Sequence, residues 1–184
     1  MQGKSERFAV IALQHLDAAY NLARWLTRND ADAADVVQES CLRALTYVDS
    51  YRGENGRAWL LTIVRNTCYR WLERNRPSAI TPLSPEVEAE ATAAAAGTAG
   101  DASSPESIVA RQCDAALLNG LIAELPLLFR EVLVLREIEE LSYRDIGAVL
   151  GVPIGTVMSR LARARGALKE AWLRRTMRGP SDGL

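Results

Sequence analysis

Residues 141–161 read LSYRDIGAVLGVPIGTVMSRL, and this stretch decides how the second half of the chain folds. Ser142 is placed to cap a helix, and Asp145 three residues later can complete a capping box. Gly151 can adopt the positive φ of a tight turn, and Pro153 suits the first turn of a new helix. The stretch predicts two short helices joined by a tight turn. That is the layout of a helix-turn-helix, whose second helix enters the major groove of DNA.

The apolar and basic residues of this region support the same prediction. Ile146, Val149 and Leu150 share one helix face, and we expect Val157 and Leu161 to point back at them. Residues 144–178 carry eight basic residues and two acidic ones, namely Arg144, Arg160, Arg163, Arg165, Lys169, Arg174, Arg175 and Arg178 against Asp145 and Glu170. The alternative is an amphipathic helical hairpin with a solvated charged face. Such a face would normally mix positive and negative side chains, so the excess of positive charge favours a polyanionic partner.

Charge is segregated along the chain. The 184 residues suffice for one domain or two small ones, and the formal net charge is only −1. Residues 86–140 are strongly acidic, with Glu86, Glu88, Glu90, Asp101, Glu106, Asp114, Glu124, Glu131, Glu137, Glu139 and Glu140 against Arg111, Arg130 and Arg136. An acidic middle between two more basic segments indicates parts with different partners.

The composition argues against several classes of protein. Cys41, Cys68 and Cys113 are far apart and lie in apolar helical patterns, so we expect small buried side chains. With His15 as the single histidine and no CxxC motif, no metal site or cofactor is expected. No signal peptide or membrane-spanning apolar stretch is visible, so we expect no membrane insertion and a cytoplasmic location.

The first half is predicted to be helical. Leu13, Leu16, Tyr20 and Ala23 recur at helical spacing. Asp30 or Asp32 can cap a second helix, whose inner face we expect to carry Val37, Cys41, Ala44 and Val48. Two glycines and an asparagine indicate a loop over residues 49–56. A third helix is predicted over residues 57–74, with an inner stripe of Leu60, Ile63, Val64, Thr67 and Trp71.

Residues 77–104 are predicted to be a flexible linker. They contain three prolines and a run of small residues, and their few large apolar side chains cannot offset the entropy of ordering. Ser104, Pro105 and Glu106 form a strong helix start, and a further break is expected at Leu125 and Pro126. The predicted fold is all-α, with helical domains over residues 1–76 and 105–178 joined by the linker.

Several motifs, taken together, resemble the bacterial sigma factors of the extracytoplasmic-function (ECF) group. In the second half these are Leu125-Pro126, residues 130–133 (REVL), 135–139 (LREIE), 141–143 (LSY) and 155–165 (GTVMSRLARAR), which resemble sigma region 4. Residues 35–39 (DVVQE) and 59–66 (WLLTIVRN) are similar to sigma region 2. The resemblance implies a subunit that directs RNA polymerase to promoter DNA, has no catalytic centre and binds an anti-sigma factor.

The resemblance also implies three sets of site residues. The −35 element would be bound through Arg144, Thr156, Ser159, Arg160, Arg163 and Arg165. Opening of the −10 element would use stacking, polar and cationic side chains, namely Tyr51, Arg52, Asn55, Trp59, Arg65, Asn66, Tyr69 and Arg70. Core RNA polymerase would be bound through Asp35, Gln38, Glu39 and Arg43. Two positions depart from the family pattern, because Met158 replaces a basic residue and Arg70 replaces an acidic or amide residue.

Two other functions stay open at this point. A dimeric helix-turn-helix regulator would match the second half alone, but it would need a sensing domain that the helical first half does not resemble. A small enzyme with Cys41 or Cys68 as nucleophile would need a base, and His15 is the only histidine.

Overall fold

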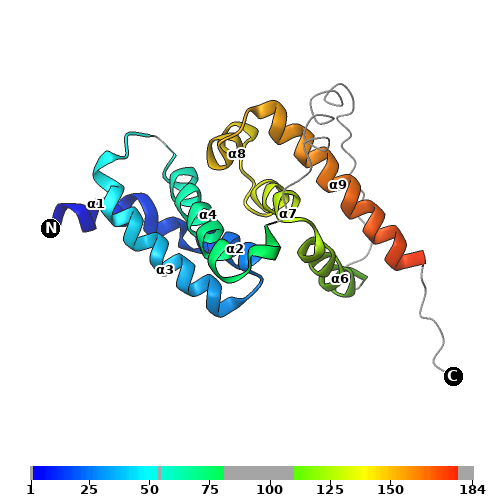
Figure 1. The fold of residues 1–184 in the computed structure, drawn as a ribbon. Coiled ribbons are helices and arrows are strands. Elements are labelled where there is room, and N and C mark those ends of the chain that lie inside the picture. Colours follow the sequence, from blue (N-terminus) through cyan, green and yellow to red (C-terminus); the bar gives the residue numbers. More distant parts are fainter. Residues whose placement is uncertain (1, 54, 81–109, 178–184) are drawn as a thin grey trace.

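The computed structural model describes residues 2–53, 55–80 and 110–177, and these residues form only helices, turns and loops. The first half runs through α1 (Gln2–Ala12), η1 (Leu13–His15), α2 (Leu16–Thr27), α3 (Asp30–Tyr47), η2 (Val48–Ser50), α4 (Gly56–Asn75) and η3 (Pro77–Ala79). The second half runs through α6 (Ala110–Glu124), α7 (Leu127–Leu133), η4 (Val134–Ile138), α8 (Tyr143–Leu150) and α9 (Ile154–Met177). The predicted all-α class, with two helical units, is confirmed (Figure 1).

Most of the predicted linker lies outside the described residues. Its first residues form the short η3 turn, and residues 81–109, which include the expected helix start at Ser104, Pro105 and Glu106, are not among those described. The predicted break at Leu125 and Pro126 is confirmed, because α6 ends at Glu124 and α7 begins at Leu127.

Asparagine side chains begin two of the helices in the first half. Asn29 accepts a hydrogen bond from the backbone N–H of Asp32 at 3.0 Å, so Asn29 caps α3, and the prediction of Asp30 or Asp32 was wrong. Asn55 caps α4 in the same way through the N–H of Ala58 at 3.0 Å. Each asparagine oxygen satisfies a donor that the first turn of a helix leaves open.

The buried face of α3 differs from the predicted one. Ala44 and Val48 are buried as predicted, but Ala33, Val36 and Ser40 are fully buried as well, whereas Val37 and Cys41 are only half-buried. The two stripes are neighbours on the helix surface. The observed stripe contains small residues, so α3 approaches α2 and α4 closely, and the larger Val37 and Cys41 lie at the edge of that contact.

The inner stripe of α4 is also broader than predicted. Leu60, Val64 and Thr67 are buried as expected, but Leu61, Cys68 and Leu72 are buried as well, while Ile63 and Trp71 are half-buried. A helix that contacts neighbours on two sides needs a wide apolar surface. Helix α4 has such neighbours, because it packs on α2 and α3 within its own half and on α8 from the other half.

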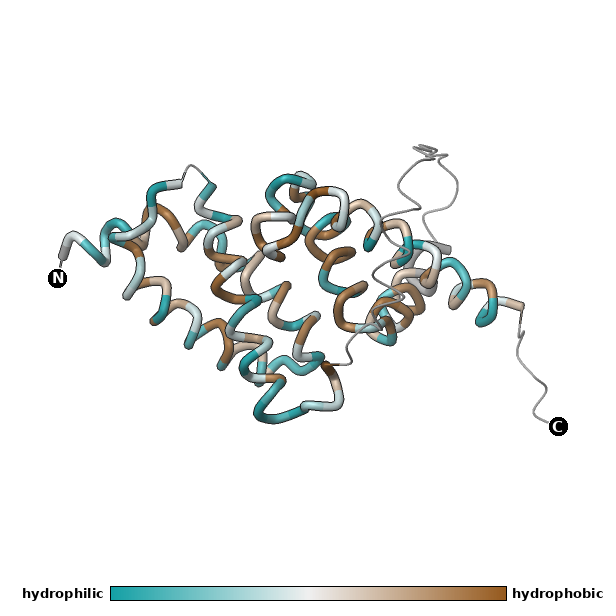
Figure 2. The backbone as a smooth tube through the Cα atoms, turned by 45° about the horizontal axis from the view of Figure 1, so that its top comes forward, coloured by the Kyte–Doolittle hydropathy of each residue, from teal (hydrophilic) through white to brown (hydrophobic). Residues whose placement is uncertain are grey.

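The two halves share one hydrophobic core. Buried residues of α2 and α4 and buried residues of α7, α8 and α9 belong to a single cluster, with α2 packed on α7 and α4 on α8. In Figure 2 the hydrophobic stretches gather where the helices face one another, and hydrophilic stretches follow the outer turns. The second half therefore packs on the first half as a body.

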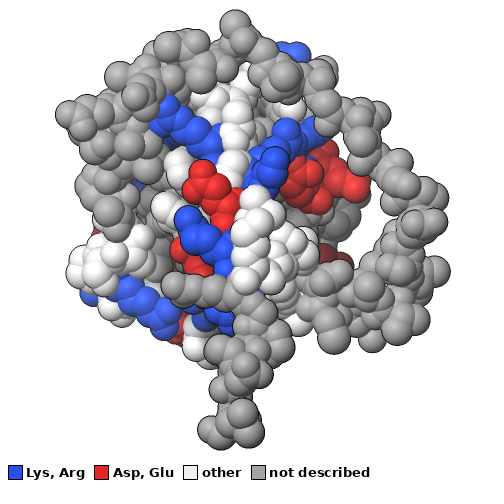
Figure 3. Space-filling view, turned by 90° about the vertical axis from the view of Figure 1, so that its right-hand side faces the viewer, with Lys and Arg blue, Asp and Glu red and all other residues white. Residues whose placement is uncertain are grey.

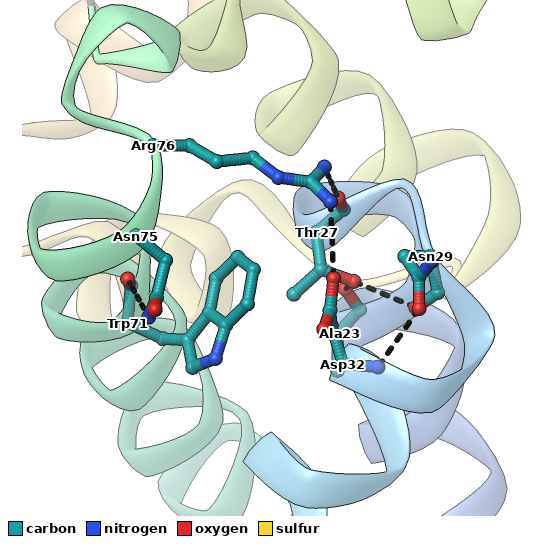
Figure 4. Close-up of polar contacts among 7 residues, drawn as sticks. All are labelled: Ala23, Thr27, Asn29, Asp32, Trp71, Asn75 and Arg76. Atoms are coloured by element: carbon teal, nitrogen blue, oxygen red, sulfur yellow. Dashed lines mark hydrogen bonds and ion pairs between the residues drawn. The ribbon is translucent and has the colours of Figure 1, made fainter.

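The C-terminal end of α4 is fastened to the junction between α2 and α3. The guanidinium of Arg76 donates to the Thr27 carbonyl at 3.0 Å and to the Asp32 carboxylate at 3.1 Å. It also lies over the Trp71 ring, 5.5 Å from the ring centroid (Figure 4). These contacts hold the Arg76 guanidinium in one position.

In the described part of the chain, no helix is by itself long and apolar enough to cross a membrane. Helices α8 and α9 would pass such a test only as a pair, and they are bent by 98° from each other.

Candidate nucleic-acid and polymerase interfaces

Helices α8 and α9 form the predicted helix-turn-helix. Ser142 caps α8 as predicted, because its hydroxyl accepts from the N–H of Asp145 at 3.1 Å. The Asp145 carboxylate accepts from the Ser142 hydroxyl at 2.7 Å, whereas the predicted capping box would have it accept from the Ser142 backbone N–H. Gly151 ends α8 with a φ of 69°, and α9 leaves at 98° to α8, within the range of this motif. The predicted apolar contacts are confirmed, since Ile146, Val149, Leu150, Val157 and Leu161 are all buried.

The turn also needs a glycine that the sequence reasoning did not single out. A Cβ added at Gly147 would lie 3.0 Å from the carbonyl oxygen of Val152. The backbone of the turn therefore passes directly over α8 at this position. This tight approach fixes the direction in which α9 begins.

The residues expected at the −35 element differ in exposure. Arg144 and Arg165 are exposed, and Thr156, Arg160 and Arg163 are half-buried. Ser159 is buried and donates its hydroxyl to the Thr156 carbonyl at 3.0 Å, so its side chain does not lie on the outer face of α9. Helix α9 thus offers Thr156, Arg160 and Arg163 near its N-terminal end, beside the exposed Met158.

The charge of this half is less one-sided in three dimensions than along the chain. Arg165 pairs with Glu137 at 2.6 Å, and Arg174 lies 3.7 Å from Glu170. Figure 3, which views the α6 and α9 side, shows blue and red side chains interspersed among the described residues. The tertiary fold brings Glu137 from η4 to the surface of α9, and counting charges by sequence position could not show this.

The loop before α4 holds part of the residues expected at the −10 element. The rings of Tyr51 and Trp59 are 5.0 Å apart between centroids and tilted by 42°. Both side chains are half-buried, Arg52 is exposed, and the exposed Asn55 also caps α4. Aromatic faces, a cation and an amide therefore lie together at this end of α4, as single-strand capture requires.

The remaining four residues of this set lie on α4 in two different environments. Asn66 and Arg70 are exposed. Arg65 and Tyr69 instead face the second half, where they contact Glu131 of α7. We call Arg65, Tyr69 and Glu131 the Glu131 cluster. Arg65 donates to the two carboxylate oxygens at 3.0 and 3.3 Å, and the Tyr69 hydroxyl donates at 2.9 Å.

Burial dominates the electrostatics of the Glu131 cluster. Glu131 is fully buried, and burial raises the pKa of its carboxyl while the positive charge of Arg65 opposes the shift. Burial also raises the pKa of Tyr69, and the Glu131 carboxylate adds to that rise. Arg65 lies over the Tyr69 ring, 4.4 Å from its centroid. Hydrogen bonds from Arg65 and Tyr69 thus satisfy the buried carboxylate.

Sequence reasoning missed Glu131 and the similar contacts of Glu139. Glu139 also contacts the first half: it forms an ion pair with Arg57 and accepts a hydrogen bond from Asn21 at 3.3 Å. The only signal for Glu131 was a charged residue inside the apolar run from Phe129 to Leu135. Such a residue indicates a buried partner, but nothing in the sequence identifies that partner.

The outer side of α3 carries the residues expected to contact core polymerase. Asp35 and Gln38 are exposed, and the half-buried Arg43 and Glu39 pair with each other at 2.5 Å. Leu42 is exposed over 62% of its surface in the same helix. A large exposed apolar side chain among polar ones is typical of a protein-binding surface.

The cysteines do not have the environment of a nucleophile. Cys68 is buried, and burial raises the pKa of its thiol to about 12. Burial raises the pKa of the Cys41 thiol as well. A reactive cysteine needs a lowered pKa and access to solvent, so these two positions do not support the alternative enzymatic function. In the part of the chain that the structure describes, no three metal-binding side chains come together.

Comparisons with known proteins agree with this architecture. The family model of sigma-70 region 2 matches residues 11–77, and that of sigma-70 region 4 matches residues 116–168. The first match covers the helices from η1 to α4, and the second covers most of α6 through much of α9. The two matches follow each other in the order that the resemblance implied.

Relatives of known name extend the match over most of the chain. The ECF RNA polymerase sigma-E factor of Salmonella typhimurium is 33% identical over 90% of this chain and 85% of its own length. ECF RNA polymerase sigma factor SigE of Mycolicibacterium smegmatis is 35% identical over 85% of this chain, which spans only 58% of that longer protein. A solved structure of the sigma factor RpoE with the anti-sigma factor NepR from Bartonella quintana has the same fold, with a TM-score of 0.64, 24% identity and coverage of 94% of this chain and 98% of RpoE. The chain belongs to the sigma-70 family of RNA polymerase sigma factors and, within it, to the ECF group.

Proposed function

We propose that this protein binds core RNA polymerase and directs it to promoters by contacting the −35 and −10 elements. One observation carries the proposal: a helix-turn-helix and a separate helical unit with single-strand capture chemistry occur in one chain. A regulator that only binds duplex DNA needs the first feature and not the second. The proposed division of labour is residues 1–76 for polymerase and the −10 element and residues 105–178 for the −35 element.

The N-terminal end of α9 supports recognition of duplex DNA. A recognition helix reads base edges through the side chains of its first turns, and arginine can donate to two acceptors of guanine at once. Thr156, Arg160 and Arg163 lie on this part of α9, and Arg144 lies exposed on α8. We assign base or phosphate contacts to these four residues and give Ser159 a packing role, since its hydroxyl is bonded to Thr156.

The end of α4 near residues 49–56 supports capture of an opened strand. Unpaired bases stack on aromatic rings and present their edges to polar groups. At this end Tyr51 and Trp59 provide rings, Asn55 an amide and Arg52 a cation, and the exposed Asn66 and Arg70 lie further along α4. Arg65 and Tyr69 donate hydrogen bonds to Glu131 while the two halves are packed together. We infer that these two residues reach DNA only after the halves separate.

The remaining assignments follow from the same proposal. The α3 surface with Asp35, Gln38, Glu39 and Arg43 binds polymerase, and Leu42 adds an apolar contact. The protein acts in the cytoplasm, where its polymerase is, and catalyses no reaction itself. An anti-sigma factor is a further proposed partner, because RpoE of Bartonella quintana was solved in complex with one.

Transcription from a promoter library with core polymerase and this protein tests the proposal. We expect run-off transcripts that depend on the protein, and permanganate-reactive thymines at the −10 element that mark an opened duplex. A protein that binds promoter fragments but never opens a bubble with any core polymerase would instead be a duplex-binding regulator.

A further inference from the structure

A cavity of about 370 Å³ lies where the two halves meet, beside the C-terminal end of α4. The first half contributes Arg28, at the end of α2, and Arg76, and the second half contributes Arg130 of α7. Leu26, Leu72 and Leu127 form apolar walls, and no carboxylate lines the cavity. Three cations and no carboxylate line the cavity, while the Asp32 carboxylate that pairs with Arg76 lies outside this lining, so the lining carries a net positive charge.

Arg130 is the most unusual of the three cations. It is only 4% exposed, and its Nη1 donates to the Ala123 carbonyl at 2.6 Å. Its buried Nε has no hydrogen-bond partner in the part of the chain that the structure describes. Burial, together with the nearby charge of Arg28, lowers the pKa of Arg130 to about 10, while Tyr69 and Glu131 oppose this shift. Burying a guanidinium whose Nε has no acceptor is costly, so the position favours an anion that can accept a hydrogen bond from it.

Arg76 and Arg28 complete the cationic side of the cavity. The contacts of Arg76 with Thr27, Asp32 and the Trp71 ring hold its guanidinium in place (Figure 4). Arg28 is exposed and forms no ion pair with the described residues. A fixed guanidinium and one that can still move together provide donors on two sides of a ligand.

We propose that this cavity binds a small phosphorylated anion between the two halves of the protein. Its volume lies within the range of small-molecule sites. Guanidinium groups pair with phosphate oxygens through parallel N–H donors, and a phosphate with more than one negative charge offsets three cations better than a single carboxylate does. The leucine walls would contact the apolar part of such a ligand.

The location of the cavity links this binding to the arrangement of the two halves. Its walls come from α2 and α4 on one side and from residues 125–130 on the other, so the complete site exists only while the halves are packed. A ligand that binds one of two arrangements shifts the equilibrium towards it. The bound anion would therefore oppose separation of the two halves. The proposed function requires this separation so that Arg65 and Tyr69 can reach DNA, and this consequence rests on that function.

Isothermal titration calorimetry of the full chain with inorganic pyrophosphate tests the binding without polymerase or DNA. We expect saturable binding with one site per chain. Arg28→Gln removes an exposed cation whose side chain forms no ion pair with the described residues, and it should weaken binding roughly tenfold or more. Arg74→Gln is the matched control, because Arg74 is also exposed and lies two residues from Arg76 but not in the cavity. It should change the affinity less than about twofold.

Two further measurements make the outcome decisive. Arg130→Met should abolish binding and keep the circular dichroism spectrum of the wild type. If Arg130→Met does not fold, the affinity of Arg28→Gln decides the question. At the same concentration, pyrophosphate should raise the melting temperature of the wild type more than that of Arg28→Gln. Absence of binding, equal losses in Arg28→Gln and Arg74→Gln, or equal affinity for citrate would each overturn the proposal of a phosphate site.

Discussion

Arg65 of α4 donates through Nε and Nη2 to the two oxygens of Glu131 in α7, at 3.0 and 3.3 Å. The two residues are 66 positions apart, and their contact crosses the boundary between the sigma region 2 and region 4 matches. A residue proposed to act on promoter DNA thus forms a buried ion pair with the other half of the protein. Any state in which Arg65 contacts DNA must first break this pair.

The pH dependence of stability should report on this pair. Burial raises the pKa of Glu131 above its ordinary 4.5, so the folded state holds this proton more tightly than the unfolded state does. The stabilisation that Glu131 provides is therefore complete below pH 4.5 and is lost as the pH rises through the raised pKa. Arg65, Tyr69 and Arg160 act on its carboxyl, and Arg130 and Cys68 interact electrostatically with it as well.

Glu131→Gln isolates this effect, since the amide cannot ionise but keeps the shape of the side chain. We expect the difference in unfolding free energy, wild type minus variant, to fall as the pH is raised from 4 to 8 in urea titrations. A difference that stays constant or rises over this range would show that Arg65 keeps Glu131 ionised throughout.

Arg163→Ala should weaken binding to −35 duplex DNA by about 1–3 kcal/mol if the side chain contacts a base, with relaxed preference at one position. A phosphate contact would instead weaken binding to all sequences alike and lower the salt dependence. Gel-shift titrations over several salt concentrations separate these cases. Arg175→Ala, on the same helix but about 18 Å further along it, is the control. Arg160→Ala should have a similar effect on DNA but also alters the surroundings of Glu131.

Reversing the charges of Asp35 and Glu39 to lysine should weaken association with core polymerase roughly tenfold or more, because like charges would then face each other across the interface. The Glu39 change also removes its pair with Arg43. Asp17→Lys with Glu73→Lys introduces the same charge at exposed positions on α2 and α4. Pull-down with core polymerase should retain this control and lose the α3 variant. Equal retention of both would remove the α3 assignment.

Asn66→Ala should block opening of a duplex promoter while leaving transcription from a template pre-melted at −10 largely intact, since the cost of unpairing is then already met. Permanganate footprinting measures the bubble directly. Glu73→Ala, exposed on the same helix, serves as control. Normal bubbles with Asn66→Ala would exclude the residue from the −10 site.

Asn55 needs a different design, because its side chain also caps α4. Asn55→Ala removes both the cap, worth about 1 kcal/mol, and the amide. Asn55→Ser keeps a side-chain oxygen for the Ala58 N–H and removes the amide without adding a charge. We expect both variants to reduce promoter opening, with only the alanine variant melting at a lower temperature. If opening follows the melting temperature alone, Asn55 acts through helix structure and not through DNA.

Gly56→Ala should destabilise the protein by about 1–3 kcal/mol, because an added Cβ would lie 2.7 Å from the carbonyl oxygen of Ile11 and push α1 away from α4. Gly120→Ala is the matched control, since nothing lies within 4 Å of a Cβ at this position in α6. That change should stabilise the helix by up to about 1 kcal/mol. Thermal unfolding of both variants would show opposite shifts, and a neutral Gly56→Ala would mean that α1 moves freely.

The helix-turn-helix could be predicted because each of its determinants acts within a few residues. The Ser142 and Asp145 contacts, the positive φ of Gly151 and the apolar face of α8 are local features. The same holds for the break before α7, where proline cannot continue a helix. The family motifs were likewise continuous in the sequence, so the class of protein could be inferred from them.

The sequence by itself therefore determined the helices, their turns and the two sigma regions. Only the tertiary structure decided which side of α3 is buried, because the small residues Ala33, Ser40 and Ala44 gain their contacts from neighbouring helices. It also decided that Arg65 and Tyr69 meet Glu131, and that Arg28, Arg76 and Arg130 line one cavity. These contacts join residues tens of positions apart, and their energies depend on burial and distance, which periodicity and spacing do not contain.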